Sequence, residues 1–151
     1  MPEKLPEKLS ELLEAFDGIV DMDQRMAMLV GYAEKFKPVP LSIAVPPYPQ
    51  SARVPFCESE AFVWAIPAPG GGLTLHFAMG NPSGVSAKAL SAILEKTLSG
   101  APASAIAAVN PDIVTRLFRQ NISMGKGMGL MGIVERVRDL ARATLRMKST
   151  P

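Results

Sequence analysis

The sequence predicts an α+β fold in which a small antiparallel sheet of about three strands packs against helices at both chain ends. Apolar residues recur at three- and four-residue spacing in the first and last parts of the chain, which is typical of helices. Two short segments between them alternate with a period of two, which is typical of strands. The link between those segments is too short for a parallel crossover, so we expect a hairpin.

Two amphipathic helices open the chain. The first is predicted over residues 7–16 and ends at Asp17 and Gly18. The second is predicted over about residues 22–36, with Asp21 as its N-cap. Its expected apolar face comprises Met22, Met26, Leu29, Val30, Ala33 and Phe36.

Five prolines lie within residues 38–49. Neither a helix nor a central strand tolerates that density, because proline lacks a backbone N–H donor. We therefore expect an extended surface loop here, and the composition favours a linker over a docking segment.

The hairpin is predicted from residues 61–66 and 73–79, with a turn at 67–72. Phe62, Trp64 and Ile66 share one face of the first strand. Thr74 and His76 stand on the opposite face of the second strand from its apolar residues, which are Leu73, Leu75, Phe77 and Met79.

Helices are expected again in the last part of the chain. They are predicted over residues 86–98, 111–119 and about 128–147, with a short helix or turn at 102–109. The glycine-rich stretch 124–129 is expected to form a tight turn that exposes the N-terminus of the last helix, a place that favours anions. The expected buried stripe of that helix is Leu130, Ile133, Val134, Val137, Leu140, Ala141 and Thr144.

Length and charge limit the class of protein. The 151 residues fit one domain spanning 1–151. The 16 basic and 14 acidic residues are too evenly balanced to indicate a nucleic-acid partner. Basic residues gather near the end, where we expect a solvated helix face: Arg136, Arg138, Arg142, Arg146 and Lys148. The first residues do not resemble a signal peptide and no long apolar run spans a membrane, so we expect a cytoplasmic location.

Cys57 is the only cysteine, so no intrachain disulfide and no multi-thiolate metal site is possible. Pro55 biases Val54 toward an extended backbone, which places Cys57 in an accessible loop. Access favours a reactive thiol, although a buried structural cysteine fits the composition equally well. Glu58 and Glu60 would oppose thiolate formation.

Other candidate chemistry is weak. His76 is the only histidine, and an ordinary half-exposed sheet residue is favoured over a Cys–His catalytic pair, which lacks a third orienting residue. No cluster has metal-ligand spacing. The stretch 124–129 is not a phosphate-binding loop, because glycine follows Gly125-Lys126 where that motif has serine or threonine.

The segment 53–59, Arg-Val-Pro-Phe-Cys-Glu-Ser, resembles the cysteine loop of the SufE family. The stretch 122–130, Ile-Ser-Met-Gly-Lys-Gly-Met-Gly-Leu, is similar to the family's Leu-Ser-x-x-Arg-x-x-Gly-Leu signature before its last helix. A proline-rich approach, a hairpin, a helix and a Leu98-Ser99-Gly100 turn occur in the family's order. The resemblance extends from about residue 5 to 145.

This resemblance implies the fold shared with IscU-type scaffold proteins. It also implies that Cys57 accepts sulfur as a persulfide from a SufS-like pyridoxal-phosphate cysteine desulfurase, stimulates that enzyme, and passes the sulfur to an iron–sulfur scaffold. The chain itself would hold no cofactor and no metal, and would act as a sulfur-transfer partner rather than a stand-alone enzyme. Phe56, Phe62 or Trp64 would line an apolar hollow for the thiol.

The resemblance implies a partner surface at Glu58, Ser59, Asn81 and Lys126, on a monomer or weak homodimer without nucleic-acid or membrane partners. Two positions depart from the family pattern. Lys126 replaces an arginine, which keeps the charge and loses the forked geometry. Asn81 stands where an acidic residue is common. The alternative function is a non-enzymatic scaffold or regulatory binding module with a structural Cys57. A cysteine hydrolase would need a base, and only His76 is present.

Overall fold

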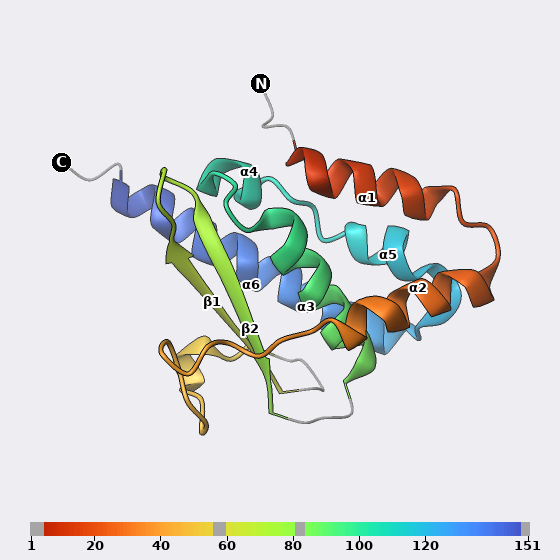
Figure 1. Ribbon diagram of the computed structural model, residues 1–151, viewed down its shortest axis with the longest axis horizontal. Helices are drawn as coiled ribbons and strands as arrows, with labels where there is room; N and C mark the ends of the chain where they lie inside the picture. The colour runs from red at the N-terminus through yellow and green to blue at the C-terminus, as the bar shows by residue number, and fades with distance from the viewer. Residues whose placement is uncertain (1–4, 56–59, 81–83, 149–151) are drawn as a thin grey trace.

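The computed structural model describes residues 5–55, 60–80 and 84–148, and confirms the α+β class. Two helices come first, then a hairpin, then four helices (Figure 1). Their bounds are α1 Glu7–Asp17, α2 Met22–Glu34, β1 Ala61–Pro67, β2 Leu73–Met79, α3 Val85–Leu98, α4 Ala103–Ala107, α5 Ile113–Phe118 and α6 Met124–Lys148. Two short 3₁₀ turns, η1 Gln50–Ala52 and η2 Arg119–Asn121, complete the set.

The sheet has two antiparallel strands in the described residues, where about three were expected. Val63 pairs with Phe77 and Trp64 with His76. The third strand is reduced to a single bridge between Arg53 and Phe62. The physical reason is that prolines precede and follow this stretch, at Pro49 and Pro55, and neither can donate a hydrogen bond to a ladder.

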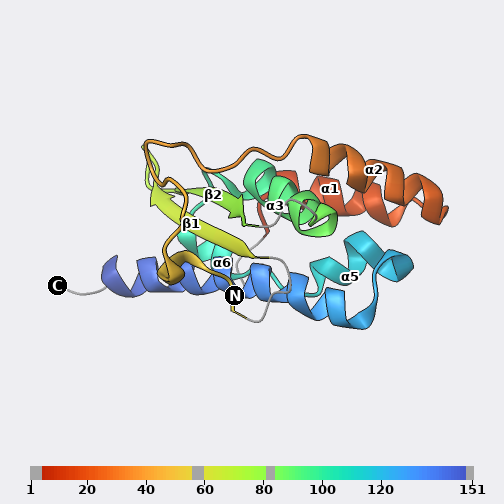
Figure 2. The same ribbon diagram turned by 90° about the horizontal axis from the view of Figure 1, so that it is seen from below.

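The two faces of the sheet belong to different clusters. On the inner face, Val63 and three buried residues of β2 join the main core with α3 and α6. In Figure 2, α6 runs along the lower edge of the molecule, and the sheet and α3 lie above it. The buried side chains of β2 in this core are Leu73, Leu75 and Phe77.

The outer face is covered by the proline-rich segment, residues 38–49. Val39 is buried, and its backbone N–H donates to the carbonyl of Phe77 at 2.8 Å. Tyr48 packs on Phe62 and Trp64, with ring centroids 5.1 and 5.5 Å apart. The segment is irregular, as predicted, but it is tied to the sheet by this small second cluster rather than acting as a free linker.

Helix α6 begins at Met124, four residues earlier than predicted. Ser123 caps it, because its Oγ accepts the backbone N–H of Lys126 at 3.2 Å. The expected tight turn at the glycines is wrong: Gly127 is buried within the helix, where tertiary packing offsets the low helix propensity of glycine. The predicted stripe is confirmed, with Leu140 and Thr144 half-buried and the rest buried.

Helix α2 buries a residue that the apolar pattern did not predict. Arg25 is fully buried, whereas Met26 and Val30 are exposed. The guanidinium of Arg25 donates to four backbone carbonyls near the C-terminal ends of α1 and α5, where helix dipoles favour a cation. The acceptors belong to Phe16, Ile19, Arg116 and Leu117. This Arg25 clamp fixes the turn between α1 and α2.

Candidate functional site

The chain enters and leaves the cysteine segment, residues 55–60, at one point. The backbone N–H of Val54 donates to the carbonyl of Ala61 at 2.8 Å, and both residues are fully buried. Arg53 and Phe62 form the next bridge. Cys57, with Phe56, Glu58 and Ser59, lies outside the described residues, so the predicted site residues there stay predictions.

A second segment begins beside the first. The backbone N–H of Gly80 donates to the carbonyl of Glu60 at 2.7 Å. A Cβ at position 80 would lie 2.9 Å from Cβ of Glu60, and closer still to its carboxylate, so glycine allows this approach. The predicted partner residue Asn81 follows directly and lies outside the described residues.

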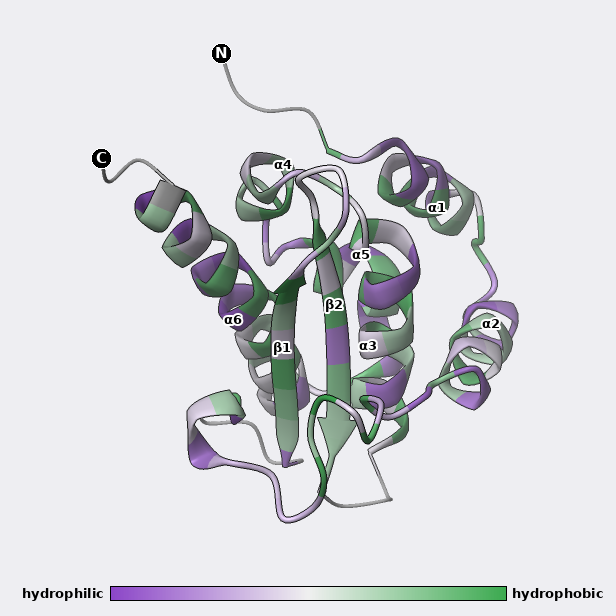
Figure 3. Cartoon of the chain, turned by 60° about the vertical axis from the view of Figure 1, so that its left-hand side comes forward, coloured by the Kyte–Doolittle hydropathy of each residue, from purple (hydrophilic) through white to green (hydrophobic). Residues whose placement is uncertain are grey.

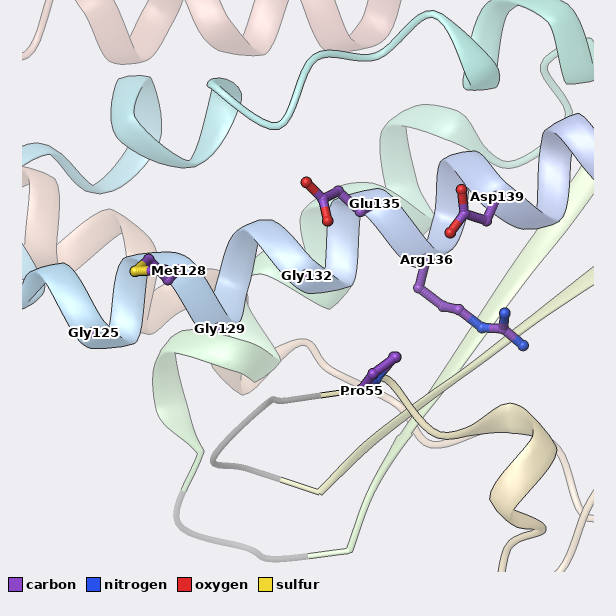
Figure 4. A pocket seen from close by; sticks show the side chains of 8 residues that line it. All are labelled: Pro55, Gly125, Met128, Gly129, Gly132, Glu135, Arg136 and Asp139. Atoms are coloured by element: carbon purple, nitrogen blue, oxygen red, sulfur yellow. The ribbon is translucent and has the colours of Figure 1, made fainter.

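An open groove of about 570 Å³ lies between Pro55 and the first half of α6 (Figure 4). Glycines at four- and three-residue spacing form one face of the helix along it. A Cβ at Gly132 would lie 3.6 Å from the carbonyl oxygen of Pro55, so the chain passes close over the helix here. The residues lining the groove are Pro55, Gly125, Met128, Gly129, Gly132, Glu135, Arg136 and Asp139.

One end of the groove is apolar and the other is charged. Met128 is exposed at the glycine end. The predicted partner residue Lys126 is also exposed on the first turns of α6, but it does not line the groove. At the other end, Asp139 lies 3.8 Å from Arg142 on the next turn, and Glu135 is exposed. The groove therefore offers both an apolar contact and carboxylates to a partner.

Two arginines of α6 are not part of a solvated face, contrary to expectation. Arg136 is half-buried, and its Nη2 donates to the carbonyl of Ser51 at 2.7 Å. Arg138 is half-buried, and its Nε donates to the carbonyl of Ala107 at 3.2 Å. These two hydrogen bonds tie α6 to η1 and to the end of α4.

His76 pairs with a carboxylate rather than standing alone. Its Nδ1 lies 3.7 Å from Oε1 of Glu95 on α3. Burial raises the pKa of Glu95, and the charges of His76 and Lys37 act in the opposite direction. Phe62 and Trp64, expected to line a hollow for the thiol, pack with Tyr48 on the outer face of the sheet.

The described parts of the chain contain no group of three histidine, cysteine or acidic side chains placed to hold a metal ion. Among the helices of the described ranges, none is long and apolar enough to cross a membrane. The groove residues Gly129, Gly132, Glu135 and Asp139 were missed from sequence. The sequence feature that could have indicated them is the recurrence of glycine inside an amphipathic helix.

Comparison with known proteins places these features in a family. Residues 10–141 match the family model described as SufE, Fe–S metabolism associated domain. The fold is similar to the solution structure of a hypothetical protein from Thermus thermophilus, with a TM-score of 0.74 and 26% sequence identity. That match covers 95% of this chain and 99% of the other. No curated protein matches the sequence.

Proposed function

Because this chain belongs to the SufE family, whose domain is associated with Fe–S metabolism, we propose that Cys57 is a sulfur acceptor. Cys57 takes sulfur from a pyridoxal-phosphate cysteine desulfurase and passes it on for iron–sulfur cluster assembly. The observation that carries this proposal is the family match over residues 10–141, which includes the only cysteine of the chain.

The transfer is a thiol exchange. The Cys57 thiolate attacks the terminal sulfur of a persulfide on the desulfurase, a new S–S bond forms at Cys57, and the donor's S–S bond breaks. The electron pair leaves with the donor cysteine as its thiolate, so the step needs no external oxidant or reductant. Unloading the donor frees its cysteine for another turnover, which accounts for stimulation of the desulfurase.

The groove along α6 supports a docking role next to this chemistry. Pro55 lines the groove and precedes Cys57 by two residues, a separation that an extended chain spans in about 7 Å. The exposed Met128 gives the partner an adaptable apolar contact. Lys126 adds a charge on the same turns of the helix, and the predicted contacts Glu58, Ser59 and Asn81 complete the proposed surface.

The first experiment is intact-protein mass spectrometry after incubation with a cysteine desulfurase, pyridoxal phosphate and cysteine. The wild type should gain the mass of one or more sulfur atoms, and Cys57→Ser should gain none. No gain on a folded wild type, with a donor shown to be active on another acceptor, would favour the binding-module function with a structural Cys57.

The second experiment tests the docking surface by titration calorimetry of the desulfurase with this chain. Lys126→Glu should weaken binding by about tenfold, because it reverses a charge at the interface. Lys37→Glu is the matched control and should leave the affinity unchanged, because Lys37 is exposed and does not line the α6 groove. Equal affinity for both variants and the wild type would exclude the Lys126 region from the interface.

A further inference from the structure

A second cleft lies between α1 and α2, away from the groove beside Pro55. Both helices pack on α3, and Figure 3 shows them apart from each other on the same side of that helix. The space between them is about 280 Å³. Its lining is mostly apolar and comprises Lys8, Glu11, Leu12, Ala15, Phe16, Met28, Tyr32, Lys96 and Thr97.

Three lysines concentrate positive charge around this cleft. The ammonium groups of Lys35 and Lys96 each lie 5.6 Å from the centre of the Tyr32 ring. Lys8 lines the cleft from α1. None of the three forms an ion pair with a carboxylate of the described residues, and Glu11 is the one acidic residue of the lining. The rim therefore favours an anionic ligand.

One wall of the cleft is attached to the buried Arg25. Phe16 lines the cleft and is fully buried, and its backbone carbonyl accepts a hydrogen bond from Arg25. The Arg25 guanidinium also sits over the Phe16 ring, 5.5 Å from its centre, and the Phe16 ring lies 6.3 Å from Tyr32. The Arg25 clamp thus fixes α1 relative to α2 before any ligand binds, which lowers the entropic cost of binding.

Size and surroundings indicate the class of ligand. The volume is slightly below the usual range for small-molecule sites, roughly 300–1,000 Å³, and suits one large side chain. Met28 is exposed and lines the cleft from α2, so it gives a ligand an adaptable apolar contact at the edge of the cleft. A rim of lysines around a single apolar pocket is complementary to a peptide in which acidic residues flank one large apolar side chain.

We propose that the α1–α2 cleft binds an acidic segment of a partner protein, which inserts one aromatic or large aliphatic side chain between its carboxylates. Lys8, Lys35 and Lys96 pair with the carboxylates, while Leu12, Phe16 and Met28 receive the anchor. Lys96 is eleven residues from Val85 along α3, a distance of about 16 Å. The cleft and the cysteine segment, which begins near the other end of α3, can therefore be occupied together.

The test is selection of random twelve-residue peptides displayed on phage against the immobilised wild-type chain. The enriched peptides should carry two or more acidic residues around one aromatic or large aliphatic residue. As synthetic peptides, they should bind the Lys8→Glu/Lys96→Glu variant about tenfold more weakly or worse, whereas Lys126→Glu should bind them as the wild type does. Enrichment of neutral or basic peptides, or of none, would overturn the proposal.

A second variant tests the pocket without changing charge. Ala15 is exposed and lines the cleft, so Ala15→Trp should fill the cleft and block the peptides. Ala108→Trp is the control, because Ala108 is exposed at the end of α4. Equal peptide binding by the two variants would contradict the site. Binding to phosphatidylglycerol vesicles that the lysine variants abolish would assign the cleft to a lipid surface and overturn the proposal.

These outcomes are independent of sulfur transfer. The Lys8→Glu/Lys96→Glu variant should still gain sulfur in the mass-spectrometric assay, because Cys57 and the α6 groove are unchanged. Loss of peptide binding with intact sulfur acceptance supports a second docking site. If Cys57 fails to accept sulfur, peptide binding that depends on Lys8 and Lys96 would still support the second docking site.

Discussion

Val54 and Ala61 join the two ends of the cysteine segment through a backbone hydrogen bond of 2.8 Å between fully buried residues. The two residues that flank the segment therefore belong to the main core. Any rearrangement that brings Cys57 to a partner need not disturb β1, because the hydrogen bond lies on the core side of the segment.

The backbone amide of Val54 should exchange with solvent slowly. Because the N–H is buried and bonded, we expect exchange at least about 100-fold slower than in an unstructured peptide. Hydrogen exchange followed by NMR measures this rate directly, with the β2 amides as the protected reference. Exchange at the rate of an unstructured peptide would show that the ends of the segment open freely.

Replacing Arg25 should destabilise the fold severely. Arg25→Met keeps much of the buried volume but leaves carbonyls at the ends of α1 and α5 and in the turn after α1 without donors, at a cost of about 3 kcal/mol in the free energy of unfolding. Arg25→Lys keeps the positive charge but loses the planar guanidinium. Its free energy of unfolding should therefore lie between those of the wild type and Arg25→Met. Urea denaturation followed by circular dichroism measures the free energy.

Arg142→Met is the matched control for Arg25. Arg142 is exposed and makes an ion pair at 3.8 Å with Asp139 on the same helix, so its loss should cost at most about 0.5 kcal/mol. Similar losses for the two variants would show that the Arg25 clamp contributes little.

Two glycines should respond oppositely to alanine. Gly125 has open space where a Cβ would lie, so Gly125→Ala should stabilise α6 by about 0.5–1 kcal/mol. At Gly72, a Cβ would lie 2.7 Å from the carbonyl carbon of Gly100, which is backbone and cannot turn aside. Gly72→Ala should therefore lower the midpoint of thermal unfolding, and stabilisation there would contradict the close approach.

The ion pair between Asp17 and Arg116 should make stability depend on pH. The hydrogen bond from Arg116 lowers the pKa of Asp17 from its usual 3.8, with the charge of Arg119 acting in the same direction. The stabilisation is therefore complete above the unfolded pKa and is lost as pH falls through the lower folded pKa.

Asp17→Asn tests this dependence. Because both side chains of the pair are about two-fifths exposed, the loss at neutral pH should stay below about 1 kcal/mol. The variant should also lose less stability than the wild type between about pH 4 and pH 2, because it lacks the titrating carboxylate. Parallel curves for the two proteins would show that the pair does not stabilise the fold.

The elements set by local pattern could be predicted from the sequence. The strand at 73–79 and the N-cap at Asp21 were predicted correctly, since alternation and side-chain capping act over a few residues. The side chain of Asp21 accepts the backbone N–H of Asp23 at 2.8 Å, as the capping rule requires.

Features set by distant contacts could not be predicted. The buried Arg25 is polar, and its carbonyl partners at Arg116 and Leu117 lie more than ninety residues away in the sequence. The start of α6 was misplaced because glycine is a poor helix former, while the packing of its glycine face against Pro55 is tertiary. In the site, Cys57 and Lys126 were named from sequence, but the groove that connects Pro55 to α6 depends on the fold.

The outer cluster has a consequence for spectroscopy. Trp64 is the only tryptophan, and it packs against Tyr48 of the proline-rich segment, with ring centroids 5.5 Å apart. Its emission therefore reports whether this segment remains attached to the sheet, whereas far-ultraviolet circular dichroism reports the helices. A denaturation curve from fluorescence that precedes the one from circular dichroism would record release of the segment from a folded core, as a step separate from global unfolding.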